Sequence, residues 1–169
     1  MCSSDLMPRI ETGAPLPIRT TARLDRAITT LPPAVPLQEG GTASALLAIS
    51  LLRCRRSSIA ALRVALHRRL QRGAALEAAL AQGEWPTRAE LRRWLAGDDS
   101  LQLQLPLIAP QRDAALWRAA LRAHTDAVRA LLVRARQLEP ADTAARAEWL
   151  LQLRRKHPEV PVDRKSTRL

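Results

Sequence analysis

Residues 117–138 read WRAALRAHTDAVRALLVRARQL, and this stretch decides the fold. Seven of its positions follow one another at alternating spacings of four and three residues. We call these positions the seam: Trp117, Leu121, His124, Val128, Leu131, Ala135 and Leu138. Three heptads of a and d positions predict a long helix with one apolar stripe. The seam is a candidate surface for a partner helix or a second copy, although packing inside a bundle is the commoner use of such a stripe.

This helix is predicted to end at Glu139, because Pro140 lacks an N–H group and its ring clashes with the preceding turn. A second helix is predicted over residues 141–157, with Asp142 in its first turn and a basic run, RRKH, at its end. Four of its side chains are expected to be buried: Ala145, Trp149, Leu150 and Leu153. Because the break between the two helices is short, the pair is predicted to form an antiparallel αα-hairpin.

The composition indicates a mostly α protein. Hydrophobic residues make up 47% of the chain, but Phe and Tyr are absent, so the core is built from Leu, Ala, Val, Ile and four Trp. Ala and Leu favour helices, whereas the β-branched and aromatic residues that strands favour are scarce. We therefore expect a helical bundle with a C-terminal αα-hairpin and at most one short edge strand, at about residues 100–108. Out-of-frame translation of a GC-rich gene gives a similar composition, but it does not give a sustained heptad spacing.

Both ends of the chain resemble translated sequencing adapter. Residues 1–6 match the adapter in one reading frame, and residues 163–169 match its reverse complement. We expect both segments to be non-native and the remaining chain to be a piece of a larger bacterial protein. Three segments are predicted between them: a Pro-rich lead-in with a short helix (7–41), an Arg-rich helical segment (42–99), and the strand with the hairpin (100–158).

Local signals place helix boundaries within the Arg-rich segment. Ser58 is expected to cap the N-terminus of a helix over residues 59–72. Gly73 and Gly83 are expected to bracket a separate short helix over residues 74–82.

The sharpest of these signals is a capping box, Thr87-Arg88-Ala89-Glu90. In such a box the Thr hydroxyl accepts from the amide of Glu90, while the Glu90 carboxylate accepts from the amide of Thr87. A helix is therefore predicted from Thr87 to about Ala96.

The stretch LQLQLPL, residues 101–107, alternates strictly between leucine and glutamine before its proline. The alternation predicts a strand with leucines on one face, and the proline favours a sheet edge. A strand followed by helices resembles the ribbon-helix-helix family of DNA-binding proteins. The resemblance implies that Gln102 and Gln104 read bases in the major groove and that Arg112 lies near phosphate. It covers few residues, and the long helix that follows lacks the early turn of that family.

The formal net charge of +11 suits nucleic acid, anionic lipid or an acidic protein as a partner. Four arginines at spacings of four, seven and seven share one side of the long helix: Arg118, Arg122, Arg129 and Arg136. These arginines are candidate phosphate contacts, which predicts binding that weakens steeply with salt. GC-rich genomes also favour Arg codons, so mutational bias is a second source of the charge. A membrane-surface helix ranks third, because the apolar face is rich in Ala.

No motif for catalysis, cofactor binding or metal binding occurs in the sequence. A Gly-rich phosphate loop and the CxxC, HExxH and GxSxG patterns are all missing. The three histidines, His67, His124 and His157, are isolated, and none has a carboxylate or thiol at a catalytic or metal-ligand spacing. We therefore expect no enzyme activity, no cofactor and no metal.

Cysteine usage and hydropathy predict a cytoplasmic location. Because Cys2 belongs to the terminal adapter-like segment, Cys54 is a single cysteine that cannot form an internal disulfide, which favours a reducing compartment. The longest apolar stretch, residues 43–52, is shorter than the ~20 residues that a membrane-spanning helix needs.

The sequence therefore predicts a non-enzymatic helical module for protein–protein interaction or scaffolding, which binds a protein partner or a second copy through its helices. The alternative is a DNA-binding protein that uses the Arg-rich helix face or the strand at residues 101–107.

Overall fold

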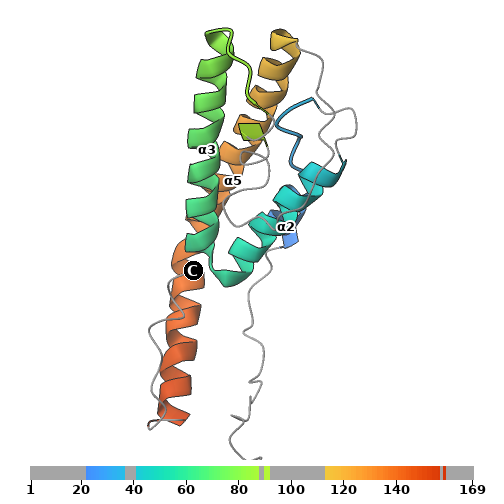
Figure 1. The fold of residues 1–169 in the computed structure, drawn as a ribbon. Helices are drawn as coiled ribbons and strands as arrows, with labels where there is room; N and C mark the ends of the chain where they lie inside the picture. Colours follow the sequence, from blue (N-terminus) through green and yellow to red (C-terminus); the bar gives the residue numbers. More distant parts are fainter. Residues whose placement is uncertain (1–21, 37–40, 88–89, 92–112, 157, 159–169) are drawn as a thin grey trace, which may run out of the picture.

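A long helix, α5 (Ala114–Lys156), runs along the molecule (Figure 1). The structure is a computed structural model that describes residues 22–36, 41–87, 90–91, 113–156 and 158. The preceding helices are α1 (Ala22–Thr29), α2 (Gly41–Ser57) and α3 (Ile59–Ala81). α3 and α1 pack against the N-terminal part of α5, and α2 packs against α3 and α1. The described part is a helical bundle, which confirms the predicted mostly α class. The predicted strand at about residues 100–108 lies outside the described residues.

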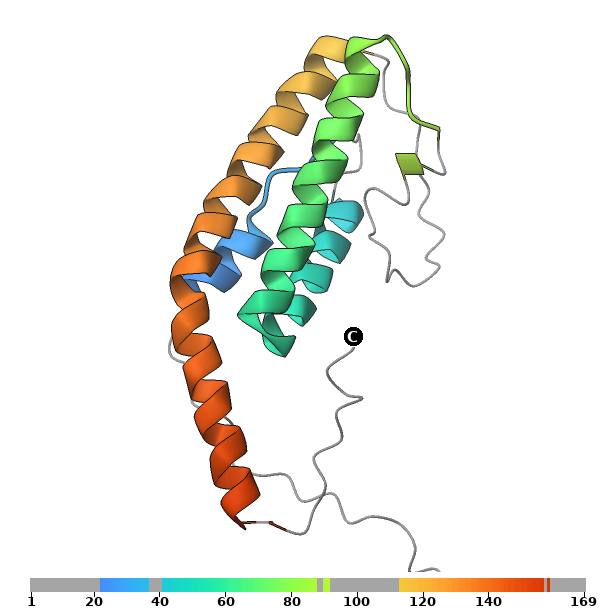
Figure 2. The same cartoon turned by 90° about the vertical axis from the view of Figure 1, so that its left-hand side faces the viewer.

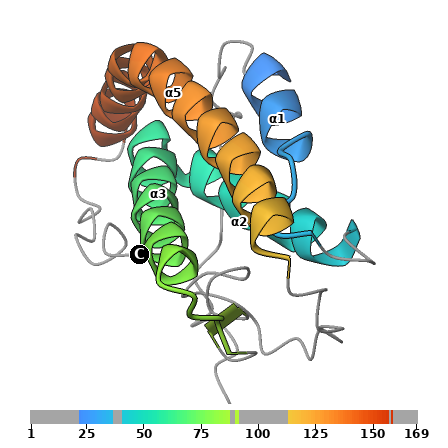
Figure 3. The same ribbon diagram turned by 90° about the horizontal axis from the view of Figure 1, so that it is seen from above.

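α3 and α5 lie side by side and antiparallel (Figure 1), while α1 contacts α5 from its other side (Figure 3). Two apolar clusters fill the space between the helices. The first joins α1, α2, α3 and α5 and contains Leu24, Ile28, Ala48, Leu51, Ile59, Leu62, Leu66, Val128, Leu131, Leu132 and Ala135. The second lies toward the start of α5 and contains Ala34, Val35, Leu76, Leu80, Leu91, Trp117 and Leu121. In the second cluster the rings of Trp85 and Trp117 meet edge to face at 5.4 Å, a favourable aromatic geometry.

α3 is one continuous helix of 23 residues, so the predicted division at Gly73 is wrong. Gly73 is buried and faces α5. A Cβ atom at this position would lie 3.5 Å from Thr125 Oγ1 and 3.8 Å from Leu121 Cδ1. The glycine therefore permits a close approach of the two helices, and tertiary packing outweighs its low helix propensity.

The two predicted ends of α3 are confirmed. Ser58 is the N-cap, and its hydroxyl accepts a hydrogen bond from the Ala61 amide at 2.9 Å. At the other end Gly83 has a φ of +80°, in the left-handed region where glycine carries no steric cost. The amide of Glu84 donates to Ala79 O at 2.9 Å, and the amide of Gly83 donates to Leu80 O at 3.3 Å. These two bonds form a Schellman motif, which terminates the helix.

The predicted capping box is also present. The amide of Glu90 donates to Thr87 Oγ1 at 3.2 Å, and the amide of Thr87 donates to Glu90 Oε2 at 2.7 Å. Of the helix predicted from Thr87 to about Ala96, Glu90 and Leu91 are helical, and residues 88–89 and 92–96 lie outside the described part of the chain.

α5 runs without interruption through Pro140, so the predicted αα-hairpin is wrong. Proline removes one backbone hydrogen bond and clashes with the preceding turn, and helices accommodate this by bending. Figure 2 shows α5 changing direction near the start of α3. Pro140 belongs to this part of α5, because Asp142, two residues later, accepts from the amide of Ile59, the first residue of α3. Alanines flank this position on the C-terminal side at Ala141, Ala144 and Ala145, and alanine is the strongest helix former. The helix therefore continues past the bend.

Candidate interaction surface

The seam lies in the core of this chain. Six of its seven side chains are at most 2% exposed, and Leu138 is partly buried against the first cluster. Its N-terminal members pack with Leu76 and Leu80 of α3, and its C-terminal members pack with Ile59, Leu62 and Leu66. The seam therefore performs bundle packing, and in this structure the chain's own helices cover it.

The polar member of the seam, His124, has both ring nitrogens occupied by the protein. Arg69 Nε donates to His124 Nε2 at 3.1 Å, and His124 Nδ1 lies 2.8 Å from Pro32 O. Because a guanidinium only donates, Nε2 is the acceptor, and the ring proton is on Nδ1, from which it is donated to Pro32 O. Burial, and next the positive charge of Arg69, lower the pKa of His124 to about 4, although the hydrogen bond to Pro32 opposes this.

Arg69 itself is buried, at 5% exposure, and its pKa is lowered to about 9 by burial and then by the nearby charge of Arg72. The Arg69–His124–Pro32 chain thus ties α3, α5 and the segment after α1 together through neutral and cationic hydrogen bonds. Among the described residues, no group of three His, Cys, Asp or Glu side chains could hold a metal ion.

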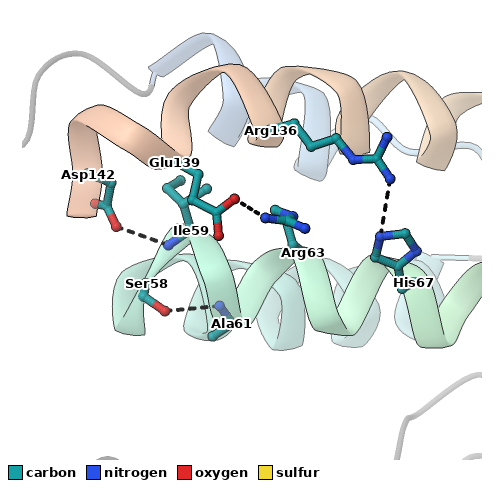
Figure 4. A network of polar contacts seen from close by, with 8 residues as sticks. All are labelled: Ser58, Ile59, Ala61, Arg63, His67, Arg136, Glu139 and Asp142. Carbon is teal, nitrogen blue, oxygen red and sulfur yellow. Dashed lines mark hydrogen bonds and ion pairs between the residues drawn. The ribbon is translucent and has the colours of Figure 1, made fainter. Parts of the chain in front are cut away.

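α5 also forms hydrogen bonds with both ends of α3. Arg118 Nη2 donates to the Leu80 carbonyl at 2.8 Å, which satisfies one of the last carbonyls of α3. At the opposite end, the Ile59 amide donates to Asp142 Oδ2 at 3.2 Å (Figure 4). A carboxylate at a helix N-terminus is favoured by the exposed amides and by the helix dipole. These two contacts fix the register of the pair.

Between these ends, further polar contacts join α3 and α5 (Figure 4). Arg63 of α3 forms an ion pair with Glu139 of α5, and Arg136 Nη2 lies 3.5 Å from His67 Nε2. Asp142 also accepts from Arg146 Nε at 2.9 Å, four residues along α5.

The four arginines predicted as phosphate contacts share one flank of α5, and each already has a partner in the chain. Arg118 contacts the Leu80 carbonyl and Arg136 contacts His67, as described above. Arg122 Nε lies 3.7 Å from Glu77 Oε1, and Arg129 Nη1 donates to Asp126 Oδ1 at 2.8 Å. Their side chains are 71% and 65% exposed, so these two ion pairs are weak. Gln102, Gln104 and Arg112 lie outside the described residues.

Beyond Asp142, α5 leaves the bundle. We call residues 143–156 the arm, and every arm residue except Arg146 is exposed. Figures 1 and 2 show this part of α5 running past the corner between α2 and α3. Four large apolar side chains of the arm face solvent: Trp149 (39% exposed), Leu150 (46%), Leu151 (60%) and Leu153 (38%).

The predicted burial of Ala145, Trp149, Leu150 and Leu153 is therefore wrong. The physical reason is the length of α3, whose first residue, Ile59, lies against Asp142. No described helix extends α3 in the direction of the arm, so the apolar face loses its cover there.

The arm as an exposed element was not predicted, although the sequence contains a sign of it. The spacing of the seam continues past Pro140 to Asp142, Ala145 and Trp149, again by four, three and four residues. An uninterrupted phase across a proline is more consistent with one bent helix than with two helices that start independently.

Comparison of the chain with known protein families, with curated proteins and with solved structures gave no match in any of the three. None of the described helices combines the length and the apolar character that crossing a membrane requires.

Proposed function

We propose that the chain is a non-enzymatic protein-interaction module, of scaffolding type, that binds a helix of another protein chain along the arm. The single observation that carries this proposal is the exposure of Trp149, Leu150 and Leu153 on a helix that projects from the bundle. Clustered apolar side chains of this size, with a tryptophan among them, are typical of protein contact sites.

The stability of the arm supports the same proposal. Isolated helices shorter than about 12–15 residues are marginal in water, because most helical stability in proteins comes from packing of an apolar face. In the described part of the chain the arm has no such packing. A helix laid against Trp149 and Leu153 would bury these side chains and hold the arm in its helical form.

Nucleic acid is the less favoured partner. The predicted phosphate contacts Arg118 and Arg136 are engaged with α3, and Arg122 and Arg129 each lie beside a carboxylate. Binding phosphate would therefore require exchange of existing contacts, which lowers the gain in free energy.

An anionic membrane surface fits the arm less well than a protein does. A helix that lies on a membrane needs its apolar residues on one face. Leu151 is two positions from Trp149 and two from Leu153, so it is about 200° round the helix from each. The large apolar residues thus lie on opposite sides of the arm.

Site-specific photo-cross-linking in the source cells tests the proposal. A photoreactive phenylalanine derivative replaces Leu150 at the edge of the Trp149 face, and in a control chain it replaces Val133, which is similarly exposed at 52% on the bundled part of α5. We expect a single adduct at position 150, identified by mass spectrometry as one segment with apolar residues at helical spacing, and no such adduct at position 133.

A Trp149→Glu substitution in the same chain should abolish the adduct without changing the unfolding midpoint, since Trp149 contributes to no cluster of the core. Adducts that form equally at both positions, or that survive Trp149→Glu, would contradict the proposed function.

A further inference from the structure

We infer that the partner of the arm is a second copy of this chain, with the two arms packed antiparallel about a two-fold axis at Trp149. This inference rests on the proposed function, because it names the partner for the same surface. It is carried by the order of residues along one face of the arm, by their complementary chemistry, and by the position of α3.

The order of residues on this face is symmetric. Starting at Asp142, which directly precedes the arm, the face carries Asp142, Ala145, Trp149, Leu153 and Lys156. The spacings between them are three, four, four and three, so the series reads the same from either end. At 3.6 residues per turn these positions stay within a narrow stripe. A stripe that is symmetric about its central residue suits a two-fold interface, in which each copy presents the same patch to the other.

The residue types are complementary under the same reversal. Trp149 meets Trp149 of the partner, and large Leu153 meets small Ala145 of the partner on either side of the axis. At the outer positions the Lys156 ammonium meets the Asp142 carboxylate of the partner. Large-against-small pairs allow helices to interdigitate, and the outer ion pairs fix register and orientation.

Existing contacts leave room for the outer ion pair. Both contacts of Asp142, to the Ile59 amide and to Arg146, use its Oδ2 atom. Its Oδ1 atom therefore remains to accept from an ammonium group. Arg154 and Arg155 fall outside the stripe and stay in solvent in the pair, so the basic tip does not bring like charges into the contact.

The position of α3 supports the antiparallel orientation. α3 runs antiparallel to α5 and begins at Ile59, beside Asp142. An antiparallel arm from a second copy would run in the same direction as α3 and would occupy the line of α3 beyond its first residue. The apolar stripe of α5 would then be covered throughout: by α3 of the same chain along the seam, and by the arm of the second copy from Asp142 to Lys156.

The closing experiment measures oligomeric state and register in the full chain. Sedimentation velocity from about 1 to 200 μM should show a monomer–dimer equilibrium with a dissociation constant on the order of micromolar, as suits a contact of about four helical turns. Trp149→Glu should shift the chain to monomer over this range. Leu151→Glu, on the opposite side of the arm, should leave the equilibrium unchanged.

Disulfide trapping tests the two-fold axis itself. In a Cys2→Ser, Cys54→Ser background, Trp149→Cys is compared with Leu151→Cys under mild oxidation. The axis places the two thiols introduced by Trp149→Cys opposite each other, so we expect covalent dimer to form at least tenfold faster than at position 151. Random collision would favour position 151, because Leu151 is 60% exposed and Trp149 is 39% exposed.

A monomer at all concentrations, or equal trapping at the two positions, would overturn the second-copy inference. The proposed function fails separately, since it depends on the cross-linked adduct at position 150. An adduct with a different protein together with a monomeric chain would keep the proposed function and remove the inference. Flotation of the monomer with phosphatidylserine vesicles, lost in Trp149→Glu, would overturn both.

Discussion

The seam and the arm belong to the same helix, and the spacing of the seam continues into the arm as far as Trp149, yet the seam is buried and the arm is open to solvent. His124 and Val128 are at most 2% exposed, whereas Trp149 is 39% exposed. The difference arises from the helix that faces α5, because α3 begins at Ile59, beside Asp142, and does not extend along the arm. Burial of a stripe is therefore set by the length of the helix that faces it, and two parts of one pattern can serve the fold and an interface respectively.

Replacing a leucine by alanine should give the largest difference in the free energy of unfolding between the seam and the arm. Leu131→Ala removes a side chain that is 2% exposed in the first cluster, and we expect a loss of about 2–5 kcal/mol in the free energy of unfolding. Leu151→Ala removes one that is 60% exposed, and we expect a change within about 0.5 kcal/mol. Urea unfolding monitored by circular dichroism measures both. Equal losses would mean that the arm is packed in solution.

Acid should weaken the bundled region through His124. Its pKa is about 4 in the folded protein and 6.5 when unfolded, so the group is neutral in both states above pH 6.5 and its contribution is fully present there. As the pH falls below 6.5, only the unfolded chain takes up the proton. Between pH 6.5 and 5 the free energy of unfolding should drop by about 2 kcal/mol.

The control for this effect is the comparison of two histidine variants. His124→Gln should flatten the stability profile over this pH range, while His67→Gln, which removes an exposed contact with Arg136, should leave the slope in place. A slope that His67→Gln removes and His124→Gln retains would assign the effect to the wrong histidine.

Pro140→Ala should raise the stability of the arm helix toward that of the bundled part of α5. The substitution restores a backbone hydrogen bond at the joint and removes a ring clash. A proline costs about 3 kcal/mol in a helix interior, and the bend relieves part of this, so we expect a gain of about 1–2 kcal/mol. Hydrogen exchange should show slower exchange at arm amides than in the parent chain. Unchanged arm exchange would indicate that the helix is already interrupted at Pro140.

Asp142→Ala should give the smallest effect at the boundary between the two regions. The loss of the acceptor for the Ile59 amide and of the Arg146 contact should cost about 1 kcal/mol. Asp126→Ala removes a carboxylate that is 71% exposed and serves as the control, with an expected change below about 0.5 kcal/mol. Thermal or urea unfolding measures the free energy of unfolding of the two variants. Equal losses would argue against a stabilising contact between Asp142 and the Ile59 amide.

The features that local sequence signals predicted are those that nearby residues determine. The Ser58 cap, the Thr87–Glu90 box and the turn at Gly83 each depend on atoms within a few residues. The heptad spacing of the seam likewise predicted burial, because periodicity depends only on helix geometry. The mostly α class follows from the same signals and from composition.

The features that were missed depend on residues distant in sequence. Gly73 continues α3 because Leu121 and Thr125 lie opposite it, and Pro140 is tolerated where α5 bends beside the start of α3. The exposure of Trp149 depends on where α3 begins. Helical periodicity placed the correct apolar residues on one face of α5. It did not predict the relative lengths of α3 and α5, and these lengths determine that the seam is buried and the arm is exposed.

Because Arg118 and Asp142 contact opposite ends of α3, the length of α3 must match the length of α5 between these two residues. One residue inserted within α3 would turn its last carbonyls by about 100° away from Arg118 while Asp142 still held its first amide. Such an insertion is tolerated only with a compensating one in α5 between these two residues. An insertion after Asp142 leaves both contacts in place, so it would change the spacing of residues along the arm without disturbing the packing of α3 against α5.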